Sequence, residues 1–204
     1  MSRKAKAQPR PDLLEAAFAL IAEKGWHGFS ALALAERTGA SLDDIHDLLP
    51  TPAALVGRLG ERLDRAMLAA PPDELLELSP RERLFELLMR RLDALAPFKP
   101  GLARLRVEAR AEVELALATL ASLDRMAAWL LDLAGLPGRG LRGRLARRAL
   151  MLAYGRVLAV WLADDTPDQD DTLAELDKRL DQLERLARLG DRLTAGLGPR
   201  PRAA

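Results

Sequence analysis

Apolar residues recur along the chain at the three- and four-residue spacing of amphipathic helices, and no stretch alternates as a half-buried strand does. The first apolar stripe follows Pro11 and Asp12, which suit the opening turn of a helix, and it ends before Gly25. Its members are Leu13, Leu14, Ala17, Phe18 and Ile21. The pattern predicts an all-α protein that opens with an amphipathic helix.

Two short helices are expected next. Ser30 is placed to cap a helix over residues 31–37, and Ser41 is placed to cap a second helix that Pro50 closes. Residues 38–40, with a central glycine, predict a tight turn between them. Two short helices joined in this way, with a helix before and another after, are typical of a helix-turn-helix.

The rest of the chain predicts longer helices separated by proline and glycine. A helix from Thr51 ends near Ala70, where two prolines follow. Ser79 and Glu82 form a capping box that opens the next helix. The long helical stretch after it can be interrupted once, near Ser122. Glycine-rich or proline-rich loops are expected over 97–101 and 135–140. The remaining helices are expected over 79–95, 102–134, 141–163 and 167–193.

These elements divide the chain into four parts. Residues 1–10 carry Arg3, Lys4, Lys6 and Arg10 without an acid and form a basic arm, which is either a solvated tail or a nucleic-acid contact. Residues 11–70 form the helix-turn-helix domain, and residues 73–195 form a helical body. Residues 196–204 are expected to be a frayed tail.

Composition favours helix and excludes several kinds of chemistry. Aromatic residues make up only 4% of the chain and β-branched residues are scarce. Without cysteine there is no disulfide, thiolate nucleophile or cysteine zinc site. No apolar run approaches the roughly 20 residues that span a bilayer, and the basic amino terminus lacks the apolar core of a signal peptide. We therefore expect a cytoplasmic protein.

No constellation of side chains indicates catalysis. The two histidines, His27 and His46, lie on different segments and do not form a metal pair. The glycine-rich stretch over 135–143 has no preceding strand and no Gly-Lys-Ser/Thr, so it does not form a phosphate loop. We expect no enzyme activity, no cofactor and no metal.

The amino-terminal part resembles the TetR family of transcriptional regulators over about residues 11–60. The residues that carry the resemblance are Gly25-Trp26, Phe29-Ser30, Ala35, Gly39, Ser41, Ile45, Pro50 and Ala54-Leu55. The resemblance implies a TetR-like headpiece that binds double-stranded DNA, with residues 41–49 as the recognition helix. It also implies a body that binds a ligand and forms a homodimer through helices 141–163 and 167–193.

The expected DNA-binding residues come from the arm and from the two short helices. They are Arg3, Lys4, Lys6, Arg10, Ser30, Ser41, Leu42, Asp44, His46, Asp47 and Thr51.

The recognition helix departs from the family pattern in its charge. The family usually has a tyrosine, a polar aromatic or basic residue and a later lysine where this chain has His46, Asp47 and Pro52. Together with Asp43 and Asp44, these acids oppose binding to phosphates. Asp43 and Asp44 also favour the positive end of a helix, and an aspartate can accept a hydrogen bond from cytosine.

The body carries large and adaptable apolar residues that suit either a ligand pocket or an ordinary core. The expected ligand-binding residues are Met126, Trp129, Met151, Tyr154 and Trp161. The leucine stripe of the last helix is compatible with core packing, a dimer interface or a membrane-surface face. Five aspartates precede that stripe, and they fit the positive end of a helix better than a calcium loop. They are Asp164, Asp165, Asp168, Asp170 and Asp171.

The carboxyl-terminal part is similar to a second family. Residues 161–168, Thr172 and residues 176–180 resemble the lipid-binding accessory protein of ubiquinone biosynthesis, a TetR-fold protein that is not a repressor. This resemblance implies an alternative function, in which the chain binds a lipid or quinone at a membrane surface and does not bind DNA.

Overall fold

The computed structural model describes residues 12–108 and 112–195, and every regular element in these ranges is a helix. The chain forms two compact units, one of residues 1–63 and 94–122 and the other of residues 64–93 and 123–204. This division differs from the expected headpiece and body, because residues 94–122 belong with the first unit. The functional boundaries at 11–70 and 73–195 remain predictions.

No helix in the described part of the chain is both long enough and apolar enough to cross a membrane.

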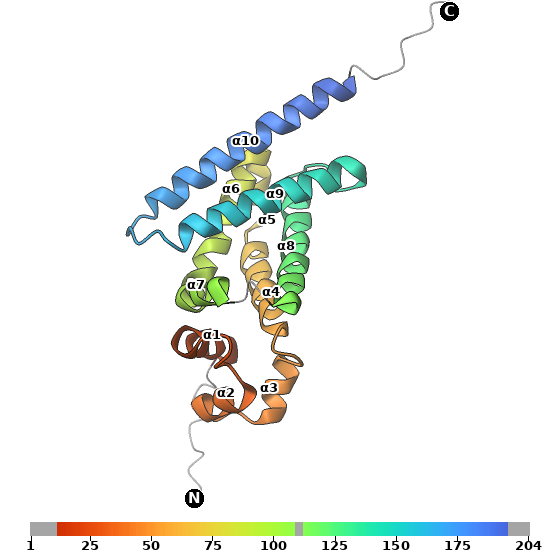
Figure 1. The fold of residues 1–204 in the computed structure, drawn as a ribbon. Coiled ribbons are helices and arrows are strands. Elements are labelled where there is room, and N and C mark those ends of the chain that lie inside the picture. The colour runs from red at the N-terminus through yellow and green to blue at the C-terminus, as the bar shows by residue number, and fades with distance from the viewer. Residues whose placement is uncertain (1–11, 109–111, 196–204) are drawn as a thin grey trace, which may run out of the picture. The chain divides into compact units, whose positions relative to one another are not determined.

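The first unit contains the helix-turn-helix and the helices that pack on it (Figure 1). Asp12 caps its first helix by accepting hydrogen bonds from the Leu14 and Glu15 N–H groups at 3.0 and 3.1 Å. The elements are α1 Leu13–Lys24, α2 Ala31–Thr38, α3 Leu42–Leu48, the 3-10 turn η1 Ala96–Phe98 and α7 Lys99–Glu108, with the first parts of α4 Ala54–Leu68 and α8 Val113–Leu133.

Helices α1 and α7 pack closely because a glycine lies between them. A Cβ added at Gly101 would overlap the backbone carbonyl oxygen of Phe18, which cannot move away as a flexible side chain could. The adjacent Phe98 ring meets Phe18 edge to face, with ring centroids 5.2 Å apart and planes at 77°. This contact fixes the position of α1.

Two charged residues hold the ends of α1. Arg62 of α4 pairs with Asp12 and with Glu15, the latter at 2.6 Å. Burial alone raises the pKa of Asp12, but hydrogen bonds from the Glu15 N–H and Arg62 outweigh it and lower the pKa. At the other end, Glu108 accepts the Trp26 N–H at 2.6 Å. Arg104 and that N–H together lower the pKa of Glu108.

Two glycine substitutions are expected to change stability in opposite directions. Gly101→Ala should lower the free energy of unfolding by about 1–3 kcal/mol, because the new methyl group overlaps the backbone of α1. Gly57→Ala, in the interior of α4 with nothing within 4 Å, should raise it by about 0.5–1 kcal/mol. Urea denaturation of both variants measures the two effects, and an equal effect at both positions would contradict the packing argument.

The second unit contains the body helices (Figure 1). Its longest members, α9 Gly140–Trp161 and α10 Asp170–Ala195, lie side by side and run in opposite directions. The others are the end of α4, α5 Pro72–Glu77, most of α6 Pro80–Leu95 and the second part of α8. The core is almost wholly apolar and includes Leu87, Leu88, Met126, Leu130, Leu150, Val157, Leu176 and Leu180.

The all-helical prediction is confirmed, but several boundaries differ. The loop expected over 97–101 is helical, because η1 Ala96–Phe98 leads directly into α7 Lys99–Glu108. The two prolines Pro71-Pro72 predict only a break, but Pro72 begins helix α5. A proline in the first turn of a helix loses no hydrogen bond, because the N–H groups there have no partner within the helix. The stretch predicted over 102–134 is split between Glu108 and Val113, whereas Ser122 lies buried inside α8. The last helix begins at Asp170, because Gln169 has a φ of 53°.

Candidate functional site

The predicted helix-turn-helix forms as α2, a glycine turn and α3. Ser30 caps α2 by accepting the Ala33 N–H at 3.1 Å. Gly39 ends that helix in the left-handed conformation, with a φ of 70°. Ser41 then caps α3 by accepting the Asp44 N–H at 3.1 Å, and its hydroxyl donates to the Asp44 carboxylate at 2.7 Å. The two helices are therefore set by local hydrogen bonds.

Buried leucine and isoleucine side chains hold α2 and α3 in the first unit. Leu34, Ile45 and Leu49 are buried, and α2 contacts both α1 and α3. The opposite side of α3 is exposed and carries Leu42, Asp43, Asp44, His46 and Asp47. Ser30, Ser41 and Thr51 are exposed as well. All the expected DNA-contact residues that the structure describes are therefore exposed to solvent.

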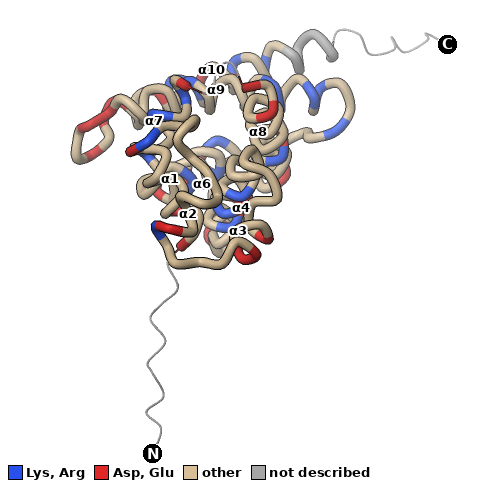
Figure 2. Tube along the Cα trace, turned by 60° about the horizontal axis from the view of Figure 1, so that its bottom comes forward, with Lys and Arg blue, Asp and Glu red and all other residues tan. Residues whose placement is uncertain are grey.

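Helix α3 carries three aspartates and no lysine or arginine (Figure 2), and all three aspartates are exposed. The carboxylate of Asp44 accepts a hydrogen bond from the Ser41 hydroxyl in the helix cap, so its presence has a structural reason that needs no ligand. Asp43 and Asp47 stand on the exposed surface. The four cations of the expected arm, Arg3, Lys4, Lys6 and Arg10, lie outside the described residues.

An arginine that the sequence argument did not single out closes the end of α3. Arg58 of α4 donates from Nε to the Leu48 carbonyl oxygen at 2.9 Å and from Nη2 to that of Asp47 at 3.4 Å. A cation suits this end of a helix, where carbonyl groups lack partners. In the sequence, Arg58 is only one basic residue in the helix that follows α3. Its role as a cap becomes visible only in the folded structure.

The expected ligand residues of the second unit do not share one environment. Met126 of α8, and Tyr154 and Trp161 of α9, are buried, and Met151 is half-buried. Trp129 is 43% exposed, because it lies away from the face of α8 that buries Met126 and Leu130. Their role in binding remains a prediction.

Four helices of the second unit bring together one carboxylate, two guanidinium groups and one phenol. Asp64 of α4 accepts from Nη1 of Arg91, on α6, at 2.5 Å and from Nε of Arg125, on α8, at 2.8 Å. The Arg91 guanidinium lies 5.9 Å from the ring centroid of Tyr154 on α9. Burial raises the pKa of Tyr154, although Arg91 acts in the opposite direction, so the phenol is neutral at physiological pH.

Asp164 anchors the connection between α9 and α10. It accepts from the N–H and hydroxyl of Thr166 at 3.0 and 2.5 Å, and from those of Thr172 at 2.9 and 2.7 Å. Asp164 was expected among the acids at a helix end, whereas it precedes α10 and accepts hydrogen bonds from Thr172 in the first turn of that helix. Asp170 and Asp171 do lie in the first turn of α10. Among the described residues no group of three potential metal-ligating side chains occurs.

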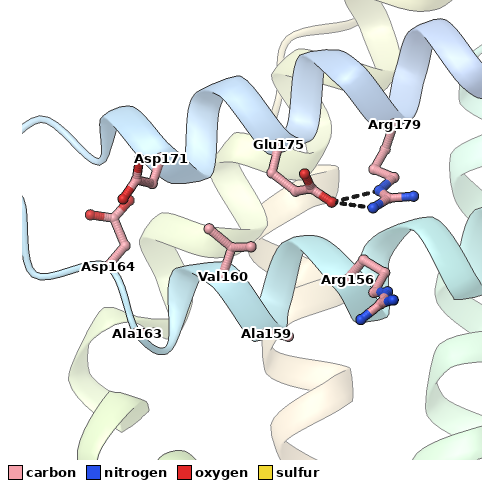
Figure 3. Close-up of a pocket in the computed structure, with 8 residues that line it drawn as sticks. All are labelled: Arg156, Ala159, Val160, Ala163, Asp164, Asp171, Glu175 and Arg179. Atoms are coloured by element: carbon pink, nitrogen blue, oxygen red, sulfur yellow. Dashed lines mark hydrogen bonds and ion pairs between the residues drawn. The ribbon is translucent and has the colours of Figure 1, made fainter.

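A groove runs along α9 and α10, and several of the polar side chains that line it are paired with residues of the protein itself (Figure 3). Glu175 and Arg179 of α10 pair with each other, with Nε and Oε1 2.6 Å apart. Asp164 at the end of the groove binds the two threonines. This groove therefore lacks the mostly apolar lining of a small-molecule site.

Asp164→Asn is expected to make the protein less stable at neutral pH. The hydroxyl and N–H groups of Thr166 and Thr172 lower the pKa of Asp164 in the folded protein. Stability from the carboxylate is thus present above the unfolded-state pKa of about 3.9, and it is lost as the pH falls through the lower folded-state pKa. The gap in melting temperature between the two proteins should narrow in acid. Asp168→Asn, an exposed control, should show no such gap.

Comparison of the whole chain with known proteins identifies the fold. No protein-family model matches the sequence, and no curated protein matches it significantly. Solved structures do match. A TetR transcriptional regulator from Nitrosomonas europaea aligns with a TM-score of 0.69 and 21% identity, over 87% of this chain and 99% of that one.

Two further solved structures agree. A TetR transcriptional regulator from Rhodococcus sp. RHA1 has a TM-score of 0.56 and 22% identity, over 84% of this chain and 92% of its own. The transcriptional regulator FadR from Bacillus subtilis, solved with stearoyl-CoA, has a TM-score of 0.54 and 21% identity. The alignment covers 84% of this chain and 95% of FadR. With its helix-turn-helix followed by a helical body, this chain has the fold of the TetR-family transcriptional regulators.

Proposed function

We propose that this chain is a TetR-family transcriptional regulator that binds double-stranded DNA as a homodimer and responds to an apolar small molecule. The observation that carries the proposal is the pair α2 and α3, capped and joined by a left-handed glycine, with polar residues on the exposed side of α3. A helix presented in this way fits the major groove of DNA.

In this proposal DNA contacts come from the short helices and from the arm. Ser30 and Thr51 can donate hydrogen bonds to phosphates, and Leu42, His46 and Asp47 can reach base edges. The hydroxyl of Ser41 already donates to Asp44, so Ser41 contributes by capping the start of α3. Asp44 lies in the cap at the start of α3, so any contact that it makes with DNA is at that end of the helix. The cations of residues 1–10 supply the attraction to phosphate that α3 lacks.

Dimerisation is proposed through α9 and α10. Both helices expose leucines that the rest of the described chain does not cover: Leu141, Leu145, Leu152, Leu186 and Leu189. Exposed apolar surface of this kind is typical of an interface between subunits. The ligand-binding part of the proposal is supported by the similar fold of FadR, which was solved with stearoyl-CoA. Ligand and DNA would then be coupled through the equilibrium between two conformations.

DNA binding measured across a salt series tests the proposal. The purified protein is titrated with the region upstream of its gene and with a scrambled duplex. We expect selective binding that weakens steeply as salt rises, because phosphate contacts release counterions. Binding to both duplexes with equal affinity, or no binding at low salt, would overturn the regulator function.

Charge variants of α3 sharpen this experiment. Replacing Asp43 and Asp47 by lysine should strengthen binding to both duplexes and increase the salt slope by about 1 for each new phosphate contact. Glu77→Lys, on the exposed side of α5, is the matched control and should leave the slope unchanged. An equal increase in slope for the control would show that net charge, and not the α3 surface, determines affinity.

The acidic surface of α3 favours a second candidate function. A protein that binds a lipid or quinone without DNA has no need for cations on that helix, and the segment 161–180 resembles such a protein. Binding to liposomes that contain ubiquinone, by a protein that fails to bind either duplex, would support this alternative.

A further inference from the structure

The buried cluster of the second unit has more positive charge than its own acid neutralises. Arg91 is 2% exposed, and both it and Arg125 donate to the single carboxylate of Asp64. In the described part of the chain, no other carboxylate pairs with either arginine. One negative charge, on Asp64 of α4, is therefore shared by two guanidinium groups, one on α6 and one on α8.

The same arginines have buried N–H groups without an acceptor. Nε of Arg91 and Nη2 of Arg125 are shielded from solvent and make no hydrogen bond among the described residues. A buried donor without a partner costs free energy, and the cost is greater for a charged group. Nε of Arg147 is also buried without a partner, but among the described residues only this cluster has two such arginines sharing one carboxylate. The cluster thus lacks an anionic acceptor.

We infer that this cluster binds the carboxylate of an apolar ligand, so the body recognises an organic acid. A guanidinium group presents parallel N–H donors that match the two oxygens of a carboxylate. Tyr154, neutral and buried beside Arg91, adds a hydroxyl that can donate a further hydrogen bond. The residues buried around the cluster are mostly apolar, which favours a ligand whose remaining part is apolar.

The two arginines of the cluster differ in their exposure to solvent. The side chain of Arg125 is 38% exposed, whereas that of Arg91 is almost wholly buried. An anion from solvent can therefore meet Arg125 first and then share the donors of Arg91. The inference rests on the proposed function only in that the body is taken as the ligand-binding part.

Calorimetric titration with a pair of matched probes tests the inference. Dodecanoate and dodecanol differ only in the head group, and both are used below their aggregation limits. We expect dodecanoate to bind at least about ten-fold more tightly than dodecanol, because charged hydrogen bonds are stronger than neutral ones. Naphthoate and naphthol repeat the comparison with a rigid aromatic body.

Substitutions assign the preference to the cluster. Arg125→Gln should reduce dodecanoate affinity at least about ten-fold and leave dodecanol affinity unchanged, and Arg125→Lys should lie between. Arg188→Gln, on an exposed part of α10, removes a charge without touching the cluster and should change neither. Circular dichroism confirms that each variant is folded. Arg91→Gln is a second variant, and it should also remove the preference for the acid.

Three results would overturn the inference: equal affinity for acid and alcohol, an acid preference that survives Arg125→Gln, or no binding of either acid. The DNA titration is independent of these measurements. Selective DNA binding without an acid preference would refute this inference and leave the regulator function intact. An acid preference without DNA binding would do the reverse.

Discussion

Replacing Asp64 with alanine is expected to lower the free energy of unfolding by about 3–5 kcal/mol, because the change strands a buried arginine. Arg91 is 2% exposed and pairs with Asp64 at 2.5 Å. Without the carboxylate, its positive charge stays in the interior with no acid to balance it, beside the neutral Tyr154. The loss is therefore set mainly by the desolvation of Arg91 and not by the strength of the pair itself.

Urea denaturation followed by circular dichroism measures the effect. Asp124→Ala is the matched control, since Asp124 pairs with Arg147 at 3.0 Å but is half exposed, and it should cost less than about 1 kcal/mol. Replacing both buried partners with apolar residues, Asp64→Leu with Arg91→Met, should recover most of the lost stability. A loss below about 1 kcal/mol for Asp64→Ala would show that Arg91 is not desolvated in solution.

Replacing Phe98 with alanine is expected to lower the free energy of unfolding by about 3–5 kcal/mol, because it empties the centre of the first unit. The ring is 0% exposed, meets Phe18 edge to face, and lies 5.2 Å from the Arg62 guanidinium. The substitution removes core packing, an aromatic pair and a cation–π contact at once.

Thermal and urea denaturation give the size of this loss. Phe98→Leu should restore about half of it, since leucine refills part of the volume without the aromatic contacts. Leu32→Ala is the control, because Leu32 is 70% exposed and buries little area on folding. Equal losses at Phe98 and Leu32 would contradict the placement of η1 in the core.

Local features of the chain determined most of the secondary structure. The caps of α2 and α3 are Ser30 and Ser41, as their positions in the sequence predict, and Gly39 takes the left-handed conformation between them. Such signals act over three or four residues, so they are visible without a fold. Boundaries were missed where a weak signal competed with a stronger one, as at Pro72, where a proline that ends one helix also begins another.

The sequence by itself determined the all-helical class and the helix-turn-helix with its acidic second helix, because periodicity and caps are local properties. It also carried the resemblance to TetR regulators. Only the tertiary structure decided which charges meet. Asp64 lies 27 residues before Arg91 and 61 before Arg125, and Trp26 lies 82 before Glu108. Charged residues are frequent on every helix of this chain, and a pair becomes special only when packing buries it and removes the competing water.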